Sequence, residues 1–552
     1  MIEELTPQLL FLGFLLVIVL SSVFTLIASL LVLWRYRRGV LRAMAETAGA
    51  ADSAPTVAAE TPAAQPALPQ AAAATAERYR LAITAPWEAV GRDAAAGAVF
   101  ALVMSAAVSL AFPALRDPVV VALYAWGYAW PMVLALVLIG PGGVHAALVA
   151  VVVYFSPLLL LTLFAVASEG SSLTSGADVY SARNMITPLS VVKAWLTANA
   201  VPTLMLILFL GRRLRAVGPL LLGLTTMATT GLIVAVLTLL TREAAALLDR
   251  AGLALPWLLL GTLLVSVAVF GLAGWWLLRA IGRAWRRKAI NDRSIRLDAL
   301  WLFFAAIYAM YYAPAGLAWA TTPVLAFAVY KAAKTALRMA LPPRTPAGGR
   351  GLTFLRVFSL GQRSDRLFDV LTRHWRHVGA IQLITGPDVA HSTVQPHQLL
   401  DFLAGRLATH FIGDLDSLEQ RMRERDQAPD REGLFRINNF FCHSDTWQAV
   451  LARLVSEGDV VLMDLRSFSE RNAGCVHELR YLANFVPLQR CVLLIDDSTD
   501  QAFVLSTLRD AWLSLDPASP NRHSGPEAVR LDRLEPGSAG LRRLLLRLCE
   551  AV

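Results

Sequence analysis

Long apolar runs separated by short polar stretches fill the first 340 residues of the chain. A helix needs about 20 consecutive apolar residues to cross the hydrocarbon core of a bilayer, and these runs reach about that length. The sequence therefore predicts nine membrane-spanning helices, with 297–337 as an alternative single re-entrant unit. The runs lie at 9–34, 94–115, 118–139, 143–166, 188–210, 217–241, 255–279, 297–314 and 316–337.

The charges that flank these runs predict how the chain is oriented. Glu3 and Glu4 precede the first run and arginines follow it, so we interpret this run as an uncleaved anchor with its amino end outside. Alternation of the spans then puts three later basic clusters on the cytoplasmic side. The carboxyl-terminal domain is therefore expected in the cytoplasm, at the plasma (inner) membrane. The three clusters lie within 212–215, 283–288 and 331–338.

Composition divides the chain into five parts. The Ala/Pro-rich stretch after the first span has almost no branched or aromatic residues to bury, which predicts disorder. Residues 78–93 are expected either at the membrane interface or as a plain lead-in to the next span. The predicted parts are an N-terminal anchor (1–43), a disordered linker (44–77), a multi-span helical membrane domain (78–340), a Pro/Gly hinge (341–351) and a cytoplasmic domain (352–552).

Beyond the hinge, short apolar strands alternate with amphipathic helices. Such alternation over about 200 residues is typical of a doubly wound, mostly parallel sheet with helices on both faces. The mixed-charge stretch 413–433 interrupts the pattern, and we interpret it as an exposed insertion. The predicted strands are 353–359, 380–385, 435–442, 459–465, 489–495 and 528–532, and the predicted helices are 364–377, 396–412, 444–456, 475–485, 500–514 and 539–551.

Charge and motif content narrow the function. The formal net charge is +9, but residues 1–349 hold 26 Lys+Arg against 15 Asp+Glu, whereas 350–552 hold 24 against 26. The excess positive charge belongs to the membrane half, so the expected partner is the lipid bilayer and no nucleic acid. The four cysteines lack metal-ligand spacing, so no metal site is predicted, and neither a Walker loop nor GxGxxG signals a bound cofactor. Ionisable residues lie near span ends, which makes transport the weaker hypothesis.

The stretch 459–479, DVVLMDLRSFSERNAGCVHEL, contains the principal candidate site. Val460–Met463 reads as a buried parallel strand, and Asp464 marks its carboxyl end, where open α/β sheets bind their ligands. The loop closes on Gly474, and Glu478 follows about one turn into the next helix. One carboxylate is thereby expected near the mouth of the crevice.

Two stretches together resemble a Toll/interleukin-1 receptor (TIR) domain. VFSLGQRSDRLFDVLTRHWRHVG at 357–379 is similar to the first strand of that family, its polar Ser-Asp loop and the helix that follows. The stretch 459–479 is similar to the family's later signature, in which a Ser-containing loop leads to a helix bearing Cys-x-x-Glu-Leu. The resemblance implies a flavodoxin-like, TIR-like sheet in the cytoplasmic domain.

In enzymatic TIR domains, the helix glutamate cleaves the nicotinamide–ribose bond of NAD. The resemblance therefore implies Glu478 as the catalytic residue and NAD as a substrate. A buried carboxylate there would stabilise the positive charge that develops on the ribose. The alternative is that Glu478 only stabilises the first turn of its helix. The residues predicted to line the nucleotide crevice are Arg363, Asp365, Arg366, Asp464, Ser469 and Trp447.

Two functions remain open at this point. In the first, a membrane-anchored TIR-like enzyme hydrolyses or cyclises NAD in a signalling or defence response, when its membrane and TIR-like domains self-associate. In the second, the protein is a non-catalytic scaffold or a nucleotide-sensing signalling protein. A catalytic Glu478 should face an open crevice, whereas a structural one should pair with Arg466, Arg471 or Arg480.

Overall fold

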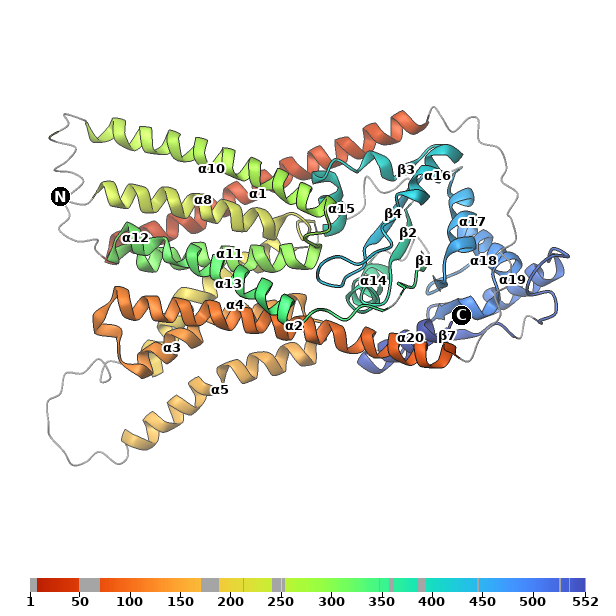
Figure 1. The fold of residues 1–552 in the computed structure, drawn as a ribbon, viewed down its shortest axis with the longest axis horizontal. Coiled ribbons are helices and arrows are strands. Elements are labelled where there is room, and N and C mark those ends of the chain that lie inside the picture. Colours follow the sequence, from red (N-terminus) through yellow and green to blue (C-terminus); the bar gives the residue numbers. More distant parts are fainter. Residues whose placement is uncertain are drawn as a thin grey trace.

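The computed structural model shows a bundle of long helices with an α/β domain at one end (Figure 1). The chain crosses between the two parts more than once, so neither part is a separate segment appended to the other. The structure describes residues 7–48, 70–169, 188–211, 213–240, 250, 254–346, 348–356, 362–385, 394–443, 446–525, 528–535 and 537–551.

The helices of the bundle run back and forth along one axis. Helix α1 (Pro7–Ala48) leads toward the α/β domain and α2 (Gln70–Ala111) leads away from it, and the later helices continue the alternation (Figure 1). The later helices are α3 (Pro118–Tyr128), α4 (Trp130–Ile139), α5 (Val144–Glu169), α6 (Pro188–Trp195), α7 (Val201–Phe209), α8 (Gly218–Leu239), α10 (Leu255–Arg286), α11 (Asp292–Tyr312), α12 (Leu317–Ala320) and α13 (Thr322–Ala340).

Seven helices among the described residues are long and apolar enough to cross a membrane. They match seven of the nine predicted runs. The other two runs correspond to α5, whose shorter apolar part is Val144–Leu160, and to α13, which carries Lys331, Lys334 and Arg338. The seven long apolar helices identify the chain as a multi-pass membrane protein. The seven are Gln8–Met44, Ala73–Ala111, Pro118–Ile139, Leu189–Phe209, Gly218–Leu239, Pro256–Arg286 and Asp292–Ala315.

The basic clusters that predicted the orientation gather at one end of the bundle. Arg213 and Arg215 follow α7, Arg283 and Arg286 lie in the last turn of α10, and Arg338 lies in the last turn of α13. Each cluster meets the α/β domain: Arg215 pairs with Asp369, Arg286 donates to the carbonyl of Ala404, and Arg338 lines a small pocket together with Glu432. The three clusters therefore lie at the same end of the bundle, as the predicted alternation of spans requires.

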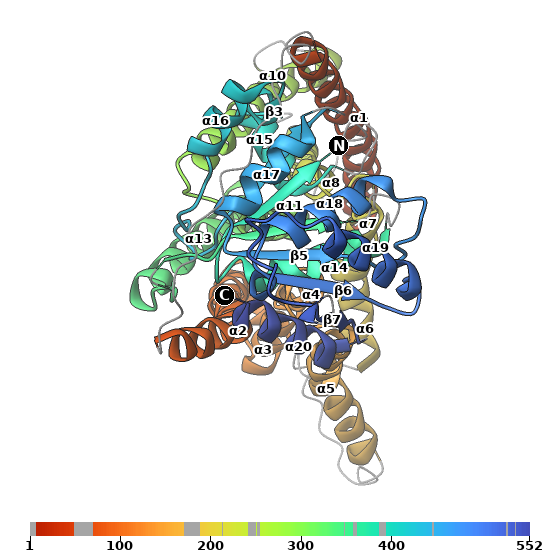
Figure 2. The ribbon, with the colours of Figure 1, turned by 90° about the vertical axis from the view of Figure 1, so that its right-hand side faces the viewer.

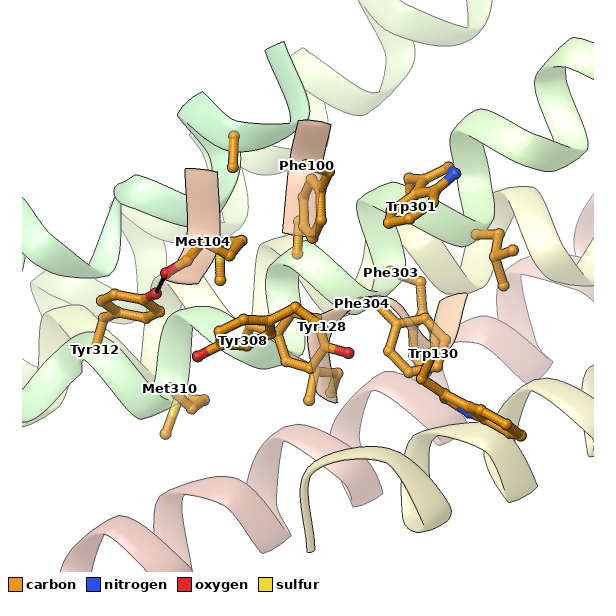
Figure 3. Packing of buried hydrophobic residues seen from close by; sticks show 14 of the residues in the cluster. Phe100, Met104, Tyr128, Trp130, Trp301, Phe303, Phe304, Tyr308, Met310 and Tyr312 are labelled. Atoms are coloured by element: carbon orange, nitrogen blue, oxygen red, sulfur yellow. Dashed lines mark hydrogen bonds between the residues drawn. The ribbon is translucent and has the colours of Figure 1, made fainter. Parts of the chain in front are cut away.

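Helix α11 forms the centre of the bundle. Phe303, Phe304, Tyr308 and Tyr312 on this helix are all fully buried. Figure 3 shows how their rings pack against neighbouring helices; Tyr308, for example, lies edge-on to Tyr128 with ring centroids 4.8 Å apart. After Asp298 this helix carries no charged residue, and a helical segment that is apolar on all sides must be enclosed by others, so this part of α11 is the element around which the bundle packs.

The α/β domain contains one seven-stranded parallel sheet. Its strand order is β3-β4-β2-β1-β5-β6-β7. All six predicted strands are present, and the two-residue β3 is additional; it lies inside the predicted helix 396–412, which ends early, at Leu403. The strands are β1 (Leu352–Arg356), β2 (Ile381–Thr385), β3 (Phe411–Ile412), β4 (Ile437–Cys442), β5 (Val460–Asp464), β6 (Cys491–Ile495) and β7 (Leu531–Arg533).

The strand order combines two doubly wound patterns. Strands β2-β1-β5-β6-β7 follow the 2-1-3-4-5 order of flavodoxin-like sheets. Strands β4 and β3 extend the sheet beyond β2, which the flavodoxin-like prediction did not include. With β4 counted and the short β3 omitted, the order becomes 3-2-1-4-5-6, which is the order of dinucleotide-binding sheets.

Helices cover both faces of this sheet. One face packs against α17 (Trp447–Glu457), α18 (Ala473–Phe485) and α19 (Gln501–Leu513). The other packs against α14 (Gln362–Trp375), α20 (Gly537–Glu550) and the first part of α2. Figure 2 shows β5 and β6 between these two layers. Helix α16 (Leu415–Arg423) adds Leu418 and Met422 to the core on the α17 face, and α15 (Pro396–Leu403) packs against α10 and α11 of the bundle.

Helix α2 belongs to both parts of the protein. Ala82 is buried in the apolar core of the α/β domain, and its carbonyl lies 2.9 Å from Nδ1 of His374 on α14. The prediction that 78–93 lies at the membrane interface or leads into a span was therefore incomplete, because this segment covers a face of the sheet. The linker predicted at 44–77 is also shorter, since α1 reaches Ala48 and α2 begins at Gln70; residues 49–69 lie outside the described chain.

Buried polar contacts fix the α/β domain against the bundle. Arg376, just after α14, lies 2.6 Å from Asp292 in the first turn of α11, and both side chains are under 10% exposed. The indole of Trp285 on α10 donates to Asp401 at 2.8 Å, and the guanidinium of Arg436 stacks 3.8 Å from the Trp285 ring. Buried charges are tolerated only when paired, so these contacts select one docking geometry.

The stretch 413–433 is not the exposed insertion that the sequence predicted. It forms α16 and a turn whose Asp430 and Glu432 accept hydrogen bonds from the side-chain amide of Asn291, the N-cap of α11, at 2.8 and 3.0 Å. Glu432 also lies 3.1 Å from Lys334 on α13. Burial opposes ionisation of Glu432, but the charges of Lys334 and Arg293 lower its pKa to about 2. Asp430 and Glu432 of this stretch therefore serve docking.

A glycine on α10 allows the closest approach between the two parts. A Cβ at Gly282 would collide with the backbone carbonyl of Leu403 at the end of α15. We expect Gly282→Ala to lower the stability of the full-length protein by about 1 to 3 kcal/mol, because backbone must move to admit the methyl group. Gly274→Ala on the same helix meets no atom within 4 Å and should be neutral or slightly stabilising. Thermal unfolding of both variants in lipid nanodiscs tests this, and equal midpoints would contradict it.

Candidate functional site

The carboxyl ends of β1 and β5 meet where the strand order of the sheet reverses. From β1 the sheet continues to β2 and β4, and from β5 it continues to β6 and β7. Parallel pairing puts Arg356, the last residue of β1, opposite Asp464, the last residue of β5. The helices that follow these strands pack on opposite faces, α14 on one and α18 on the other. This is the position at which doubly wound sheets bind ligands.

The carboxylate of Asp464 is fully engaged by its own loop. Arg466 donates from Nε to Oδ1 at 2.7 Å and from Nη2 to Oδ2 at 2.6 Å, and both residues are buried. The same guanidinium donates to the backbone carbonyl of Arg363 at 3.3 Å. Asp464 therefore orients the loop after β5 and links it to the start of α14.

Arg363 extends from α14 to the loop that follows β6. Its guanidinium pairs with Asp496 and donates to the hydroxyl of Ser498 at 3.1 Å. That hydroxyl lies 3.0 Å from the hydroxyl of Ser467, which has a φ of 58°. Non-glycine residues rarely adopt such a φ, and this strain is concentrated at binding sites. The Arg363 side chain is 49% exposed, so a ligand anion can reach it.

The other predicted site residues are dispersed. Asp365 lies 3.3 Å from Arg356, the last residue of β1. Arg366 is exposed on α14 and contacts none of these groups within the described chain. The hydroxyl and amide of Ser469 both donate to the Asn472 side chain, which shapes the turn before α18. The half-buried Trp447 on α17 packs against the ring of His477, at 5.2 Å between centroids, and does not reach the crevice residues described above.

Glu478 occupies a buried position on α18. It is 3% exposed, and its Oε2 atom has no hydrogen-bond partner among the described residues. Burial raises the pKa of this carboxyl to about 8, so it is largely protonated at neutral pH. The thiol of Cys475, one turn earlier, lies 3.9 Å from the Arg356 carbonyl at the end of β1. Glu478 therefore lies about one helical turn further from the carboxyl end of β1 than Cys475 does.

Neither of the two expected environments surrounds Glu478. The side chain is buried, so it does not face an open crevice. It forms no ion pair within the described part of the chain, because Arg466 is engaged by Asp464 and both Arg471 and Arg480 are exposed. A buried, unpaired and protonated carboxyl is unusual, and such groups are enriched at functional sites.

Sequence reasoning missed several members of the crevice. Arg356, Ser467, Asp496 and Ser498 contribute to it, and only their neighbours were predicted. A signal for Asp496 was present, since it directly follows the predicted strand 489–495 and therefore lies at the carboxyl edge of the sheet. No signal pointed to Arg356, which ends a strand that was predicted to continue to 359.

Comparison with protein-family models, curated proteins and solved structures gave no match. The resemblance to TIR domains therefore rests on the two sequence stretches. Among the described residues, no group of three or more His, Cys, Asp or Glu side chains is arranged to hold a metal ion. The carboxyl ends of β1, β5 and β6 instead present guanidinium and hydroxyl groups, which are donors suited to phosphate oxygens.

Proposed function

We propose that the protein is a membrane-bound, nucleotide-sensing signalling protein. Its α/β domain binds a nucleotide at the carboxyl ends of β1 and β5, on the cytoplasmic side of the plasma membrane. The observation that carries this proposal is the half-exposed Arg363 guanidinium at the switch point of the sheet, next to the Ser467 and Ser498 hydroxyls. A phosphate can replace Asp496 as the partner of this arginine.

The docking contacts support a role in signalling. Helix α2 forms part of the sheet's own core, and α10 and α11 are joined to the α/β domain by the Trp285–Asp401 and Arg376–Asp292 contacts. A rearrangement at the carboxyl ends of β1 and β5 can therefore be transmitted through these contacts to the membrane helices. A movement of the membrane helices can be transmitted to the α/β domain in the same way. Such coupling requires that the contacts between the two parts differ between two states of the protein. The docking contacts can supply that difference.

Cleavage of NAD is the second candidate, and Glu478 favours it. A carboxyl that is buried, unpaired and raised in pKa to about 8 is suited to proton transfer at neutral pH. To act on a nucleotide in the crevice, Glu478 would have to become accessible from the β1 edge. NAD is therefore the probe for both candidates, as ligand in the first and as substrate in the second.

Binding of NAD to the full-length protein in lipid nanodiscs tests the proposal. Arg363→Gln should weaken binding about tenfold or more, because a charge-assisted contact to phosphate is lost. Arg366→Gln, on the same helix and equally positive, is the matched control and should bind like the unaltered protein. Equal binding by Arg363→Gln would contradict the nucleotide site. Release of nicotinamide that disappears in Glu478→Gln would establish the enzyme instead of the sensor.

A further inference from the structure

A cavity of about 220 Å³ lies between the bundle and the α/β domain and shares no residue with the β1/β5 crevice. Its apolar wall comes from the ends of α4 and α7, with Leu138, Ile139 and Leu210. Its polar wall comes from the first turn of α11 and from α14. Three candidate membrane spans end or begin at this level, at Ile139, Phe209 and Asp292. The cavity therefore lies at the depth of the lipid headgroups, at the end that carries the α/β domain.

Positive charge dominates the lining of this cavity. Five arginines and two aspartates line it, which leaves three formal positive charges. Asp93, which is not part of the lining, pairs with Arg293 and offsets one of them. Two charges remain without a compensating carboxylate among the described residues. The charged lining residues are Arg215, Arg293, Arg296, Arg373, Arg376, Asp292 and Asp369.

Two of these arginines have to share a single carboxylate. Arg376 lies 2.6 Å from Asp292, and Arg296 lies 3.3 Å from the other oxygen of the same side chain. Arg373 has no carboxylate partner within the described chain and donates to the backbone carbonyl of Gly140 at 3.0 Å. Arg296 and Arg373 are therefore the source of the surplus charge.

Unused donors also line the cavity. Arg215 donates from Nη1 to Asp369 at 2.8 Å, but its buried Nε and Nη2 atoms have no acceptor among the described residues. The histidines do not add to the charge, since desolvation, followed by the charges of Arg293 and Arg376, lowers the pKa of His377 well below its usual value. Desolvation likewise lowers the pKa of His397. The group that fits this lining is an anion able to accept several N–H donors at once.

We propose that this cavity binds a phosphate group, carried either by an anionic lipid headgroup or by a small soluble ligand. Its volume is below the roughly 300 to 1,000 Å³ of pockets for drug-sized ligands, so it holds a phosphate or a small headgroup rather than a whole nucleotide. The bound phosphate contacts α11 on the bundle side and α14 on the α/β side. Binding therefore stabilises the docked arrangement of the two parts.

Thermal unfolding of the full-length protein in nanodiscs tests this site in two arms. In the first arm, the nanodiscs contain only phosphatidylcholine, and inorganic phosphate is titrated against chloride at equal ionic strength. In the second arm, phosphatidylglycerol replaces part of the phosphatidylcholine. Binding to the folded state raises the unfolding midpoint. A rise in the first arm identifies a soluble phosphate ligand, and a rise in the second arm alone identifies a lipid headgroup.

The deciding variant is Arg373→Gln. It removes a charge without leaving a carboxylate unpaired, so the protein should still fold. We expect its affinity for the ligand that stabilises the unaltered protein to fall at least tenfold. Arg287→Gln, at an exposed arginine after α10 at the same end of the bundle, should respond like the unaltered protein. The site is overturned if neither arm raises the midpoint, or if Arg373→Gln responds as Arg287→Gln does.

Discussion

Asp292→Asn should destabilise the full-length protein by about 3 to 5 kcal/mol, the usual cost of leaving buried charge without its partner. The carboxylate lies 2.6 Å from Arg376 and 3.3 Å from Arg296, and the asparagine amide cannot neutralise either guanidinium. Because Arg376 belongs to the α/β domain and Asp292 to α11, the loss falls on the docking of the two parts. The thermal unfolding midpoint in nanodiscs measures it, together with the rate of proteolysis within residues 341–351.

A surface carboxylate provides the control for this variant. Glu550 pairs with Arg547 at 2.9 Å, but both side chains are more than 40% exposed, so Glu550→Gln should change stability by less than about 1 kcal/mol. The double variant Asp292→Asn with Arg376→Gln should recover part of the lost stability. Asp292→Asn alone leaves Arg376 and Arg296 without their carboxylate, and the second substitution removes one of these two charges. If Asp292→Asn unfolds at the same temperature as Glu550→Gln, the docking contact does not carry the assigned role.

Glu478→Gln should change how stability depends on pH. Burial raises the pKa of Glu478 to about 8 in the folded protein, against about 4.5 for an ordinary glutamate. Between these values the folded state keeps the proton and the unfolded state has lost it, so the folded state binds more protons. Stability therefore falls as the pH rises through this window, by at most about 1.4 kcal/mol per pH unit for this group.

The glutamine side chain cannot ionise, so the variant removes this dependence. At pH 5 the variant and the unaltered protein should be close in stability, and at pH 8 the variant should be more stable by about 3 to 5 kcal/mol. Unfolding midpoints measured at each pH unit from 5 to 8 test this. Glu470→Gln, at an exposed glutamate just before α18, should keep the slope of the unaltered protein. A parallel pH profile for Glu478→Gln would mean that the carboxyl is already ionised in the folded state.

The crevice was only partly predictable from the sequence. Asp464 was identified because it marks the end of a predicted strand, where parallel sheets bind ligands, and Arg363 because it matches the first-loop position that the resemblance to TIR domains implies. Their roles were not identifiable, since the Arg466–Asp464 pair and the Arg363–Asp496 pair depend on which side chains the loops bring together. Glu478 shows the same limit: its helix was predicted, but whether it faced solvent, a ligand or the core depended on packing.

The contacts between the bundle and the α/β domain could hardly be predicted from the sequence. The charges of 413–433 are typical of a solvated insertion, and nothing local distinguishes Asp430 or Glu432 from surface residues. Their partners lie on helices far away in the chain, with Asn291 separated from Asp430 by 139 positions. The long-range pairing of charges has no periodicity, so no pattern along the chain predicts it.

The sequence by itself determined the parts of this protein that depend on local order. Apolar runs of bilayer length predicted the helices, basic clusters predicted that one end of the bundle adjoins the α/β domain, and alternating strands and helices predicted the parallel sheet. Only the tertiary structure decided that α2 completes the core of that sheet, that Oε2 of Glu478 is buried without a hydrogen-bond partner among the described residues, and that five arginines surround one cavity. Periodicity and length are properties of a single segment, whereas burial and charge pairing are properties of segments that meet only when the chain has folded.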